Sequence, residues 1–213
     1  LVFGVEEPRA GAAQRRPAAP IQWKTLGELG GAYWFVVAVG GVFTLARFSE
    51  AFLILRAQQQ GLPDTYAPLV LAAMSIVYAL SAYPVGKLAD RMSHVRLLSG
   101  GLITLFIADL VLAQAQGLAA VALGVALWGL HMGMTQGLLA TMVADAAPAH
   151  LRGTAFGFFN LASGVAMLIA SVVAGLLWDQ LGAAVTFYAG ALFSLAALIT
   201  LVLGDRRWRG RGC

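Results

Sequence analysis

A few ionisable side chains stand inside long apolar stretches of the sequence. Arg47 and Glu50 lie three positions apart in "FTLARFSEAFLIL". On a continuous helix residues at this spacing share a face and can pair. The two charges then either neutralise each other inside a helix bundle or have a function, in which Arg47 binds an anionic group or Glu50 carries the coupling proton. Each ionisable group costs about 2.5–3.5 kcal/mol at the centre of a membrane span, so a functional role has to be considered for both.

Two further spans carry isolated polar groups. Asp109 lies in the third span, "LFIADLVLAQ", toward its outer side, and is either an acid hydrated through the next loop or a further binding residue. His131 lies in "LWGLHMGMTQGLL", with Trp128 one turn before it and Gln136 five positions after it. His131 is either a buried histidine bonded to a neighbouring helix or a group that lines a cavity, which Trp128 can line as well. The candidate substrate- or proton-binding residues are therefore Arg47, Glu50, Asp109, Trp128, His131 and Gln136.

Charge also gathers in one short loop, "GKLADRMSHVR", at residues 86–96. It holds Lys87, Arg91 and Arg96 with an aspartate and a histidine, although only 11% of the chain is charged. The aspartate can accept hydrogen bonds from the exposed amides of a helix N-terminus and can pair with arginines. From charge alone, the loop is either an ordinary basic loop at a membrane surface or a functional element.

The composition indicates which elements must position these residues. The 213 residues are 60% hydrophobic, with a mean hydropathy of +0.79. Soluble domains are about 45–50% apolar and about 25% charged, so we expect an integral membrane protein. The single cysteine, Cys213, excludes a disulfide framework, and the three histidines are not spaced as metal ligands are. We therefore expect no metal site and no cofactor.

Six apolar segments are long enough to cross a bilayer as helices. We place them at residues 32–55, 66–88, 97–115, 118–143, 153–177 and 184–204. The expected domains are residues 1–30, the end of a preceding span plus a basic linker, residues 31–204, a six-helix bundle, and residues 205–213, a basic tail. A short interfacial helix is expected around Trp23. Leu1 is interpreted as a cut edge, so we expect the chain to be a piece of a longer protein.

The basic residues predict the orientation of the bundle, because Lys and Arg are enriched in cytoplasmic loops. If the helices alternate in direction, 12 of the 14 Lys and Arg residues lie on one side. They are Arg9, Arg15, Arg16, Lys24, Lys87, Arg91, Arg96, Arg152, Arg206, Arg207, Arg209 and Arg211. This side, with both chain ends, is predicted to be cytoplasmic. The basic residues stand at the ends of apolar runs, so the net charge of +4 points to a bilayer surface and not to nucleic acid.

Two loops resemble signatures of the major facilitator superfamily. The first resembles its pattern Gly-x-Leu-Ala-Asp-Arg-x-Gly-Arg-Lys, between the second and third helices of a six-helix half; the matching residues are Gly86, Leu88, Ala89, Asp90 and Arg91. Ser93, His94 and Val95 depart from it, as is typical of the copy in the C-terminal half. The second, "DAAPAHLRGTAFGFFNLASG", is similar to the Pro-x-x-x-Arg-Gly-x-x-x-Gly connection between the fourth and fifth helices, through Pro148, Arg152, Gly153 and Gly157.

The resemblance implies an all-α membrane protein that forms one half, most simply the C-terminal half, of a secondary transporter. Such a protein moves a small solute by alternating access, driven by the solute's own gradient or by a proton gradient. The resemblance also implies that Asp90, Arg91 and Arg152 hold a cytoplasmic gate closed, with Gly86 and Gly153 in the same motifs. The implied partners are a missing N-terminal half or a second copy, in a bacterial inner membrane.

Other classes fit less well. Leucine follows Gly86-Lys87, and Ser81 stands where the first glycine of an ATP-binding loop belongs. A rhomboid-type serine protease needs Gly-x-Ser-Gly, but Leu161 replaces the first glycine before Ser163-Gly164. No enzymatic activity is therefore expected. A non-transporting receptor or assembly subunit on the same scaffold stays open as the alternative to a transporter.

Overall fold

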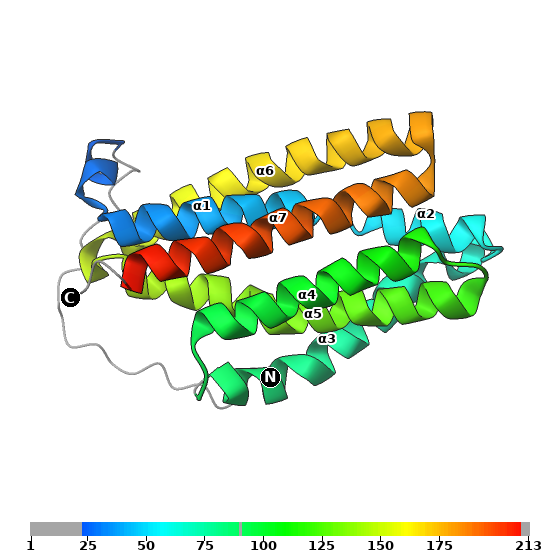
Figure 1. The fold of residues 1–213 in the computed structure, drawn as a ribbon, viewed down its shortest axis with the longest axis horizontal. Coiled ribbons are helices and arrows are strands. Elements are labelled where there is room, and N and C mark those ends of the chain that lie inside the picture. Colours follow the sequence, from blue (N-terminus) through cyan, green and yellow to red (C-terminus); the bar gives the residue numbers. More distant parts are fainter. Residues whose placement is uncertain (1–22, 90, 210–213) are drawn as a thin grey trace, which may run out of the picture.

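A computed structural model describes residues 23–89 and 91–209 of the chain. These residues form helices and connecting turns, and no strand occurs among them. Six helical stretches are long and apolar enough to span a membrane: Gly31–Gln59, Asp64–Ala89, His94–Ala113, Leu118–Ala146, Ala149–Leu181 and Ala183–Leu203. The predicted fold class, an all-α bundle of six membrane spans, is thus confirmed (Figure 1).

Several spans are built from more than one helix. The first consists of α1 (Gly31–Ala46) and α2 (Ala51–Gln59), and a 3₁₀ helix, η1 (Trp23–Glu28), precedes it where a short interfacial helix was expected. The remaining helices are η2 (Asp64–Tyr66), α3 (Ala67–Ala89), α4 (His94–Ala113), α5 (Leu118–Ala146), η3 (Ala149–Leu151), α6 (Arg152–Leu181) and α7 (Ala183–Arg209). Helix α7 continues beyond residue 204, the expected end of the bundle. Residues 1–22 of the expected linker and residues 210–213 of the expected tail lie outside the described residues.

The helices run side by side along the long axis of the molecule in two groups (Figure 1). One group holds α1, α6 and α7, and the other holds α3, α4 and α5. Helix α4 packs against both α5 and α7, so it joins the two groups. The two halves of the first span have different neighbours, because α1 packs on α6 and α7 whereas α2 packs on α3 and α5.

The buried core consists of two apolar clusters placed one after the other along the bundle. One contains Phe48, Leu105, Trp128 and Phe187, and the other contains Tyr33, Phe43, Leu102 and Val143, among others. Buried Thr44, His131 and Thr135 lie near the level where the clusters meet, as the order of residues along α1 and α5 shows. Polar side chains in the middle of the bundle therefore come from both groups of helices.

Helices α3 and α6 are the least covered spans. Only 17% of the α3 span and 11% of the α6 span are buried, against 39–44% for the other four. Large apolar side chains such as Leu80 and Leu168 are exposed on them, at 72% and 65%. These two helices thus present the largest apolar surfaces to lipid or to another part of a membrane assembly.

Three turns at the same end of the bundle contain glycines in the left-handed backbone region. They are Gly61 (φ 95°), Gly117 (φ 83°) and Gly182 (φ 86°), which follow the ends of α2, α4 and α6. Glycine adopts this conformation at little cost because it has no Cβ atom. The tight turns let antiparallel helices follow each other with few linking residues.

Candidate transport site at the interrupted first span

The first span is broken at the positions of its charged residues. Helix α1 ends at Ala46, and Arg47 leaves the helical region with φ −115° and ψ 89°. The backbone N–H of Arg47 donates to Thr44 O at 3.1 Å. The backbone hydrogen bonds of the next helix begin where Phe52 N–H donates to Ser49 O at 3.2 Å. The expectation that Arg47 and Glu50 share one continuous helix is therefore wrong.

Local side chains favour this break. Thr44 Oγ1 donates to Gly40 O at 2.7 Å, a back-bond that often bends helices. Ser49 Oγ accepts from the backbone N–H of Ala51 at 3.3 Å and so satisfies a free donor in the first turn of α2. The unwound segment, residues 47–50, is flanked by buried helix on both sides. In transporters, interrupted spans tend to lie where backbone and side chains face a binding site.

Arg47 and Glu50 are half-buried in the unwound segment. The charge of Arg47 interacts with Glu50 and with Tyr78 of α3. Among the described residues, however, the only ion pair within 4.0 Å is His150–Glu28. The guanidinium and the carboxylate are thus close enough to influence each other without being locked together, which leaves both able to bind another group.

His131 is fully buried and fixed to a neighbouring helix. Its Nδ1 lies 2.8 Å from Gly101 O of α4, so this nitrogen donates, since a carbonyl oxygen only accepts. The imidazole stacks on Phe43 with ring centroids 5.3 Å apart, and Arg47 lies within electrostatic range. The hydrogen bond matches the structural alternative for His131. Its Nε2 is buried without a hydrogen-bond partner, so the ring keeps one free acceptor.

Asp109 is buried to 0% exposure, and neither carboxylate oxygen has a hydrogen-bond partner. The alternative of an acid hydrated through the following loop is therefore wrong. The carboxyl group lies against α7 at Gly190, where a Cβ atom would stand 2.8 Å from Asp109 Oδ2 and 2.8 Å from Phe48 Cε1. Only the missing side chain of Gly190 leaves room for both groups. Neither Phe48 nor Gly190 was among the candidates, because no pattern along the sequence distinguishes them.

Trp128 joins the same group through Phe48. The two rings lie 5.4 Å apart, and the buried Trp128 Nε1 has no hydrogen-bond partner. Gln136 is half-buried farther along α5, and no hydrogen bond links it to these residues within the described part of the chain. The unwound segment thus lies near five of the six candidates. Arg47 and Glu50 belong to it, His131 interacts with Arg47, and Phe48 lies beside Trp128 and Asp109.

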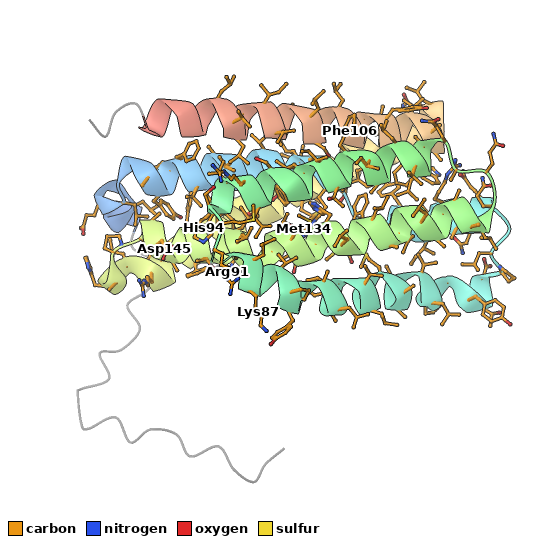
Figure 2. The ribbon with its side chains drawn as sticks, turned by 60° about the horizontal axis from the view of Figure 1, so that its bottom comes forward. Lys87, Arg91, His94, Phe106, Met134 and Asp145 are labelled. Atoms are coloured by element: carbon orange, nitrogen blue, oxygen red, sulfur yellow. The ribbon has the colours of Figure 1, made fainter. Side chains whose placement is uncertain are left out.

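The second set of candidates lies at the end of the bundle where α3 ends and α4 begins. Figure 2 shows Lys87, Arg91, His94 and Asp145 gathered there. Arg91 is exposed, as are Gly86 and Gly153. Arg152 Nε donates to Ala144 O at 3.2 Å, which ties the start of α6 to the end of α5. Asp90, the central residue of the expected gate motif, lies outside the described residues.

A cavity of about 420 Å³ opens at the same end of the bundle, between α1, α4 and α5. His94 and Asp145 are among its lining residues. Within the part of the chain that the structure describes, no three His, Cys, Asp or Glu side chains could together hold a metal ion.

Comparisons with known proteins agree with this architecture. The sequence model of the Major Facilitator Superfamily matches residues 35–211. The chain is 29% identical over 172 residues to the uncharacterized MFS-type transporter MJ1317 of Methanocaldococcus jannaschii, which covers 78% of this chain and 43% of that protein. It is 30% identical over 141 residues to the uncharacterized MFS-type transporter YwfA of Bacillus subtilis, over 65% of this chain and 34% of that protein.

A third relative is the quinolone resistance protein NorA of Staphylococcus aureus, 22% identical over 67% of this chain and 37% of that protein. Among solved structures, the POT family transporter PepTSo superimposes with a TM-score of 0.68 at 19% identity, over 83% of this chain and 37% of that one. The chain thus spans less than half the length of each of these proteins.

The match to the family covers most of the chain, and the six membrane-length helices agree with it. Members of this family are membrane transporters and not enzymes, as expected. The chain belongs to the Major Facilitator Superfamily.

Proposed function

We propose that this chain forms one six-helix half of a secondary transporter that moves a small solute by alternating access. The partner is a second six-helix half, either an N-terminal half or another copy of the chain. The sparse burial of α3 and α6 supports a partner, because these helices leave wide apolar surfaces that a second half can cover. The matched region covers only 43% and 34% of the two MFS-type relatives, so each of them is long enough to contain a second half, which supports a partner as well.

The interrupted first span is the observation that carries the proposal. It places the guanidinium of Arg47 and the carboxylate of Glu50 in an unwound segment beside His131 and Tyr78. A structural subunit that only packs against others gains nothing from half-buried charges at a helix break, which cost free energy in a membrane. In this proposal Arg47 binds an anionic part of the solute, and Glu50 carries a coupling proton.

The basic end of the bundle is the proposed cytoplasmic gate. Arg91 and Arg152 lie at the ends of α3 and α6 in motifs that resemble the family's gate loops, and Asp90 completes the first motif. Both chain ends face the cytoplasm in this proposal. The expected membrane of a bacterial host is the inner membrane, where a proton gradient is available.

Transport by the natural gene product tests the function. Cells that produce the protein are loaded with candidate solutes, starting with a quinolone because one relative is a quinolone resistance protein. Efflux or uptake is followed with and without a pH gradient. We expect Glu50→Gln to reduce proton-coupled transport to the level of cells without the protein, while insertion into the membrane stays normal.

Glu28→Gln is the matched control, because Glu28 is an exposed acid in η1 outside the spans. It should leave transport unchanged. If Glu50→Gln transports like the unaltered protein, Glu50 is not the proton carrier. If no solute of a broad panel moves, the receptor or assembly-subunit alternative replaces the transporter. In the same assay, Asp90→Asn should change the transport rate. If both the rate and the balance of inward- and outward-open states stay unchanged, the gate role is refuted.

A further inference from the structure

Asp109 is the buried group that the proposed transport cycle does not yet explain. It lies about one helical turn before the end of α4, fully buried, with both carboxylate oxygens unpartnered. An isolated carboxylate in such surroundings is strongly disfavoured unless it is neutralised. The carboxyl group can be neutralised either by a cation or by a proton.

No cation among the described residues serves this purpose. Helix α7 faces Asp109 with Gly190, and the unwound segment faces it with the ring of Phe48. Helices α4 and α5 pack antiparallel, with Leu112 of α4 against Gly124 of α5 and Gly101 of α4 against Thr135 of α5. In this register Trp128 of α5 lies at the level of Asp109. Trp128 contributes an uncharged N–H donor that has no partner.

Neither basic residue of the first span forms an ion pair with Asp109. Arg47 interacts with Glu50, Tyr78 and His131, and Arg56 donates to the carbonyl oxygens that end α4. A proton is therefore the neutralising ligand that these surroundings favour.

Phe48 lies beside Asp109 at Gly190 and belongs to the unwound segment, whose other residues are half-buried. It is 4% exposed and packs against Trp128, Phe52 and Phe187 with ring centroids 5.3–5.6 Å apart. Its backbone lies in the break, where neither Phe48 nor Ser49 donates a backbone hydrogen bond among the described residues. A segment with so few backbone hydrogen bonds can shift at lower cost than a continuous helix.

The ring also has space to move into. An apolar pocket of about 170 Å³ lies between α6 and α7, next to Phe48, and is lined by Phe48, Gly190, Ala170 and Phe193, among others. An apolar cavity of about 150 Å³ accommodates a benzene ring. A movement of Phe48 toward Ala170 and Phe193 would take the ring away from Trp128.

We propose that Asp109 is a proton-binding site closed by the ring of Phe48, and that it exchanges its proton when the unwound segment shifts the ring into the neighbouring pocket. In the closed arrangement the carboxyl group is neutral. When the ring moves, water reaches the group, the O–H bond breaks, and the proton passes to that water. The inference rests on the proposed function and deepens it, because it adds a second proton-binding residue to the one proposed at Glu50. The protonation of Asp109 can nevertheless be measured without transport.

Infrared spectroscopy of the protein in lipid membranes tests the proposal. A protonated carboxyl group has a carbonyl stretch distinct from that of a carboxylate. Near neutral pH we expect this band in the unaltered protein, its loss in Asp109→Asn and its displacement in Asp109→Glu. The glutamate variant keeps the carboxyl group, so it assigns the band even if the asparagine variant folds poorly. Asp179→Asn, which alters an exposed acid on α6, is the matched control and should leave the band unchanged.

The closing role of Phe48 is tested by transfer to D₂O, which shifts the band as the proton exchanges. Exchange should be slow in the unaltered protein and about tenfold or more faster in Phe48→Ala, because loss of the ring lowers the cost of opening. Phe159→Ala removes an equally large buried ring of α6, at Gly40, and should leave the exchange rate unchanged.

If no carboxyl band depends on Asp109, the proton site is refuted. If the band is present but Phe48→Ala exchanges no faster than Phe159→Ala, the closing role of Phe48 is refuted. Either result leaves the transport assay of Glu50→Gln unaffected, so the two proposals can fail separately.

Discussion

At the residue scale, Arg56 has a role that its position alone does not reveal. It is one of the two basic residues away from the predicted cytoplasmic side, and its side chain is buried. Arg56 Nε donates to Leu112 O at 2.9 Å, and Nη2 donates to Ala113 O at 3.2 Å and Ala115 O at 3.1 Å. The last carbonyl groups of a helix lack partners within it, so one guanidinium completes the end of α4 and fixes α2 to it.

This contact predicts a stability loss in Arg56→Met. Methionine retains much of the apolar stem but removes the hydrogen bonds to all three carbonyl oxygens, of which Leu112 O keeps only the longer bond from Ala115 N–H at 3.4 Å. This loss should lower the free energy of unfolding by about 1–3 kcal/mol. Thermal unfolding in detergent measures the effect. Arg96→Met is the control, because Arg96 is exposed and makes no such contact. Equal melting temperatures for the two variants would show that the Arg56 cap contributes nothing.

At the element scale, glycines determine how closely α5 approaches α3. A Cβ atom at Gly129 would lie 2.5 Å from the backbone oxygen of Met74, and one at Gly133 would overlap Ser81 Oγ. Gly137, two turns after Gly129 on the same helix, has nothing within 4 Å of its Cβ position. In membranes, small residues at helix contacts allow the close packing that replaces the hydrophobic driving force between helices.

Two alanine substitutions on α5 separate packing from helix propensity. Gly129→Ala must push α3 away, because a backbone atom cannot rotate out of the way as a side chain can, and should cost about 1–3 kcal/mol. Gly137→Ala adds a methyl group in open space and should be neutral or slightly stabilising. Unfolding of both variants in detergent checks this. A Gly129→Ala protein as stable as Gly137→Ala would contradict the close α3–α5 packing.

At the scale of the whole molecule, charge is strongly asymmetric. The basic loop residues that Figure 2 labels, Lys87 and Arg91, lie together at one end of the bundle, and the left-handed glycine turns lie at the other. Lys and Arg resist transfer across the membrane, so their distribution orients the bundle as it inserts. We therefore expect the basic end, with the C-terminal tail, to be cytoplasmic.

The single cysteine allows a direct test of this orientation. Cys213 belongs to the tail, outside the described residues. A membrane-impermeant maleimide should label it only after the cells are permeabilised. In a Cys213→Ser background, Gln116→Cys places a cysteine at an exposed position of the α4–α5 turn, at the opposite end, and should react in intact cells. The reverse labelling pattern would mean that the bundle has the opposite orientation.

Much of this organisation could be predicted from the sequence. The six spans are visible because hydropathy and length are local properties, and about 20 apolar residues suffice for a membrane-spanning helix. The two loop motifs pointed to the family for the same reason, since each lies within one short segment. The predicted candidates Arg47, Glu50 and His131 followed from their rarity in apolar surroundings. The break at residues 47–50 could not be predicted, because no proline interrupts "FTLARFSEAFLIL" and the stretch is typical of a continuous helix.

The amino-acid sequence by itself determined the number of spans, the charge asymmetry and the few ionisable groups placed inside the membrane. Only the tertiary structure decided which of these groups meet. Asp109, Trp128 and Gly190 come from three different helices, and they meet around Phe48 because α1, α4, α5 and α7 pack at one level. Whether Asp109 is hydrated or sealed depends on the missing side chain of Gly190, far along the chain. Packing between the spans determines which side chains are buried and which side chains they contact, and no local pattern of residues encodes such contacts.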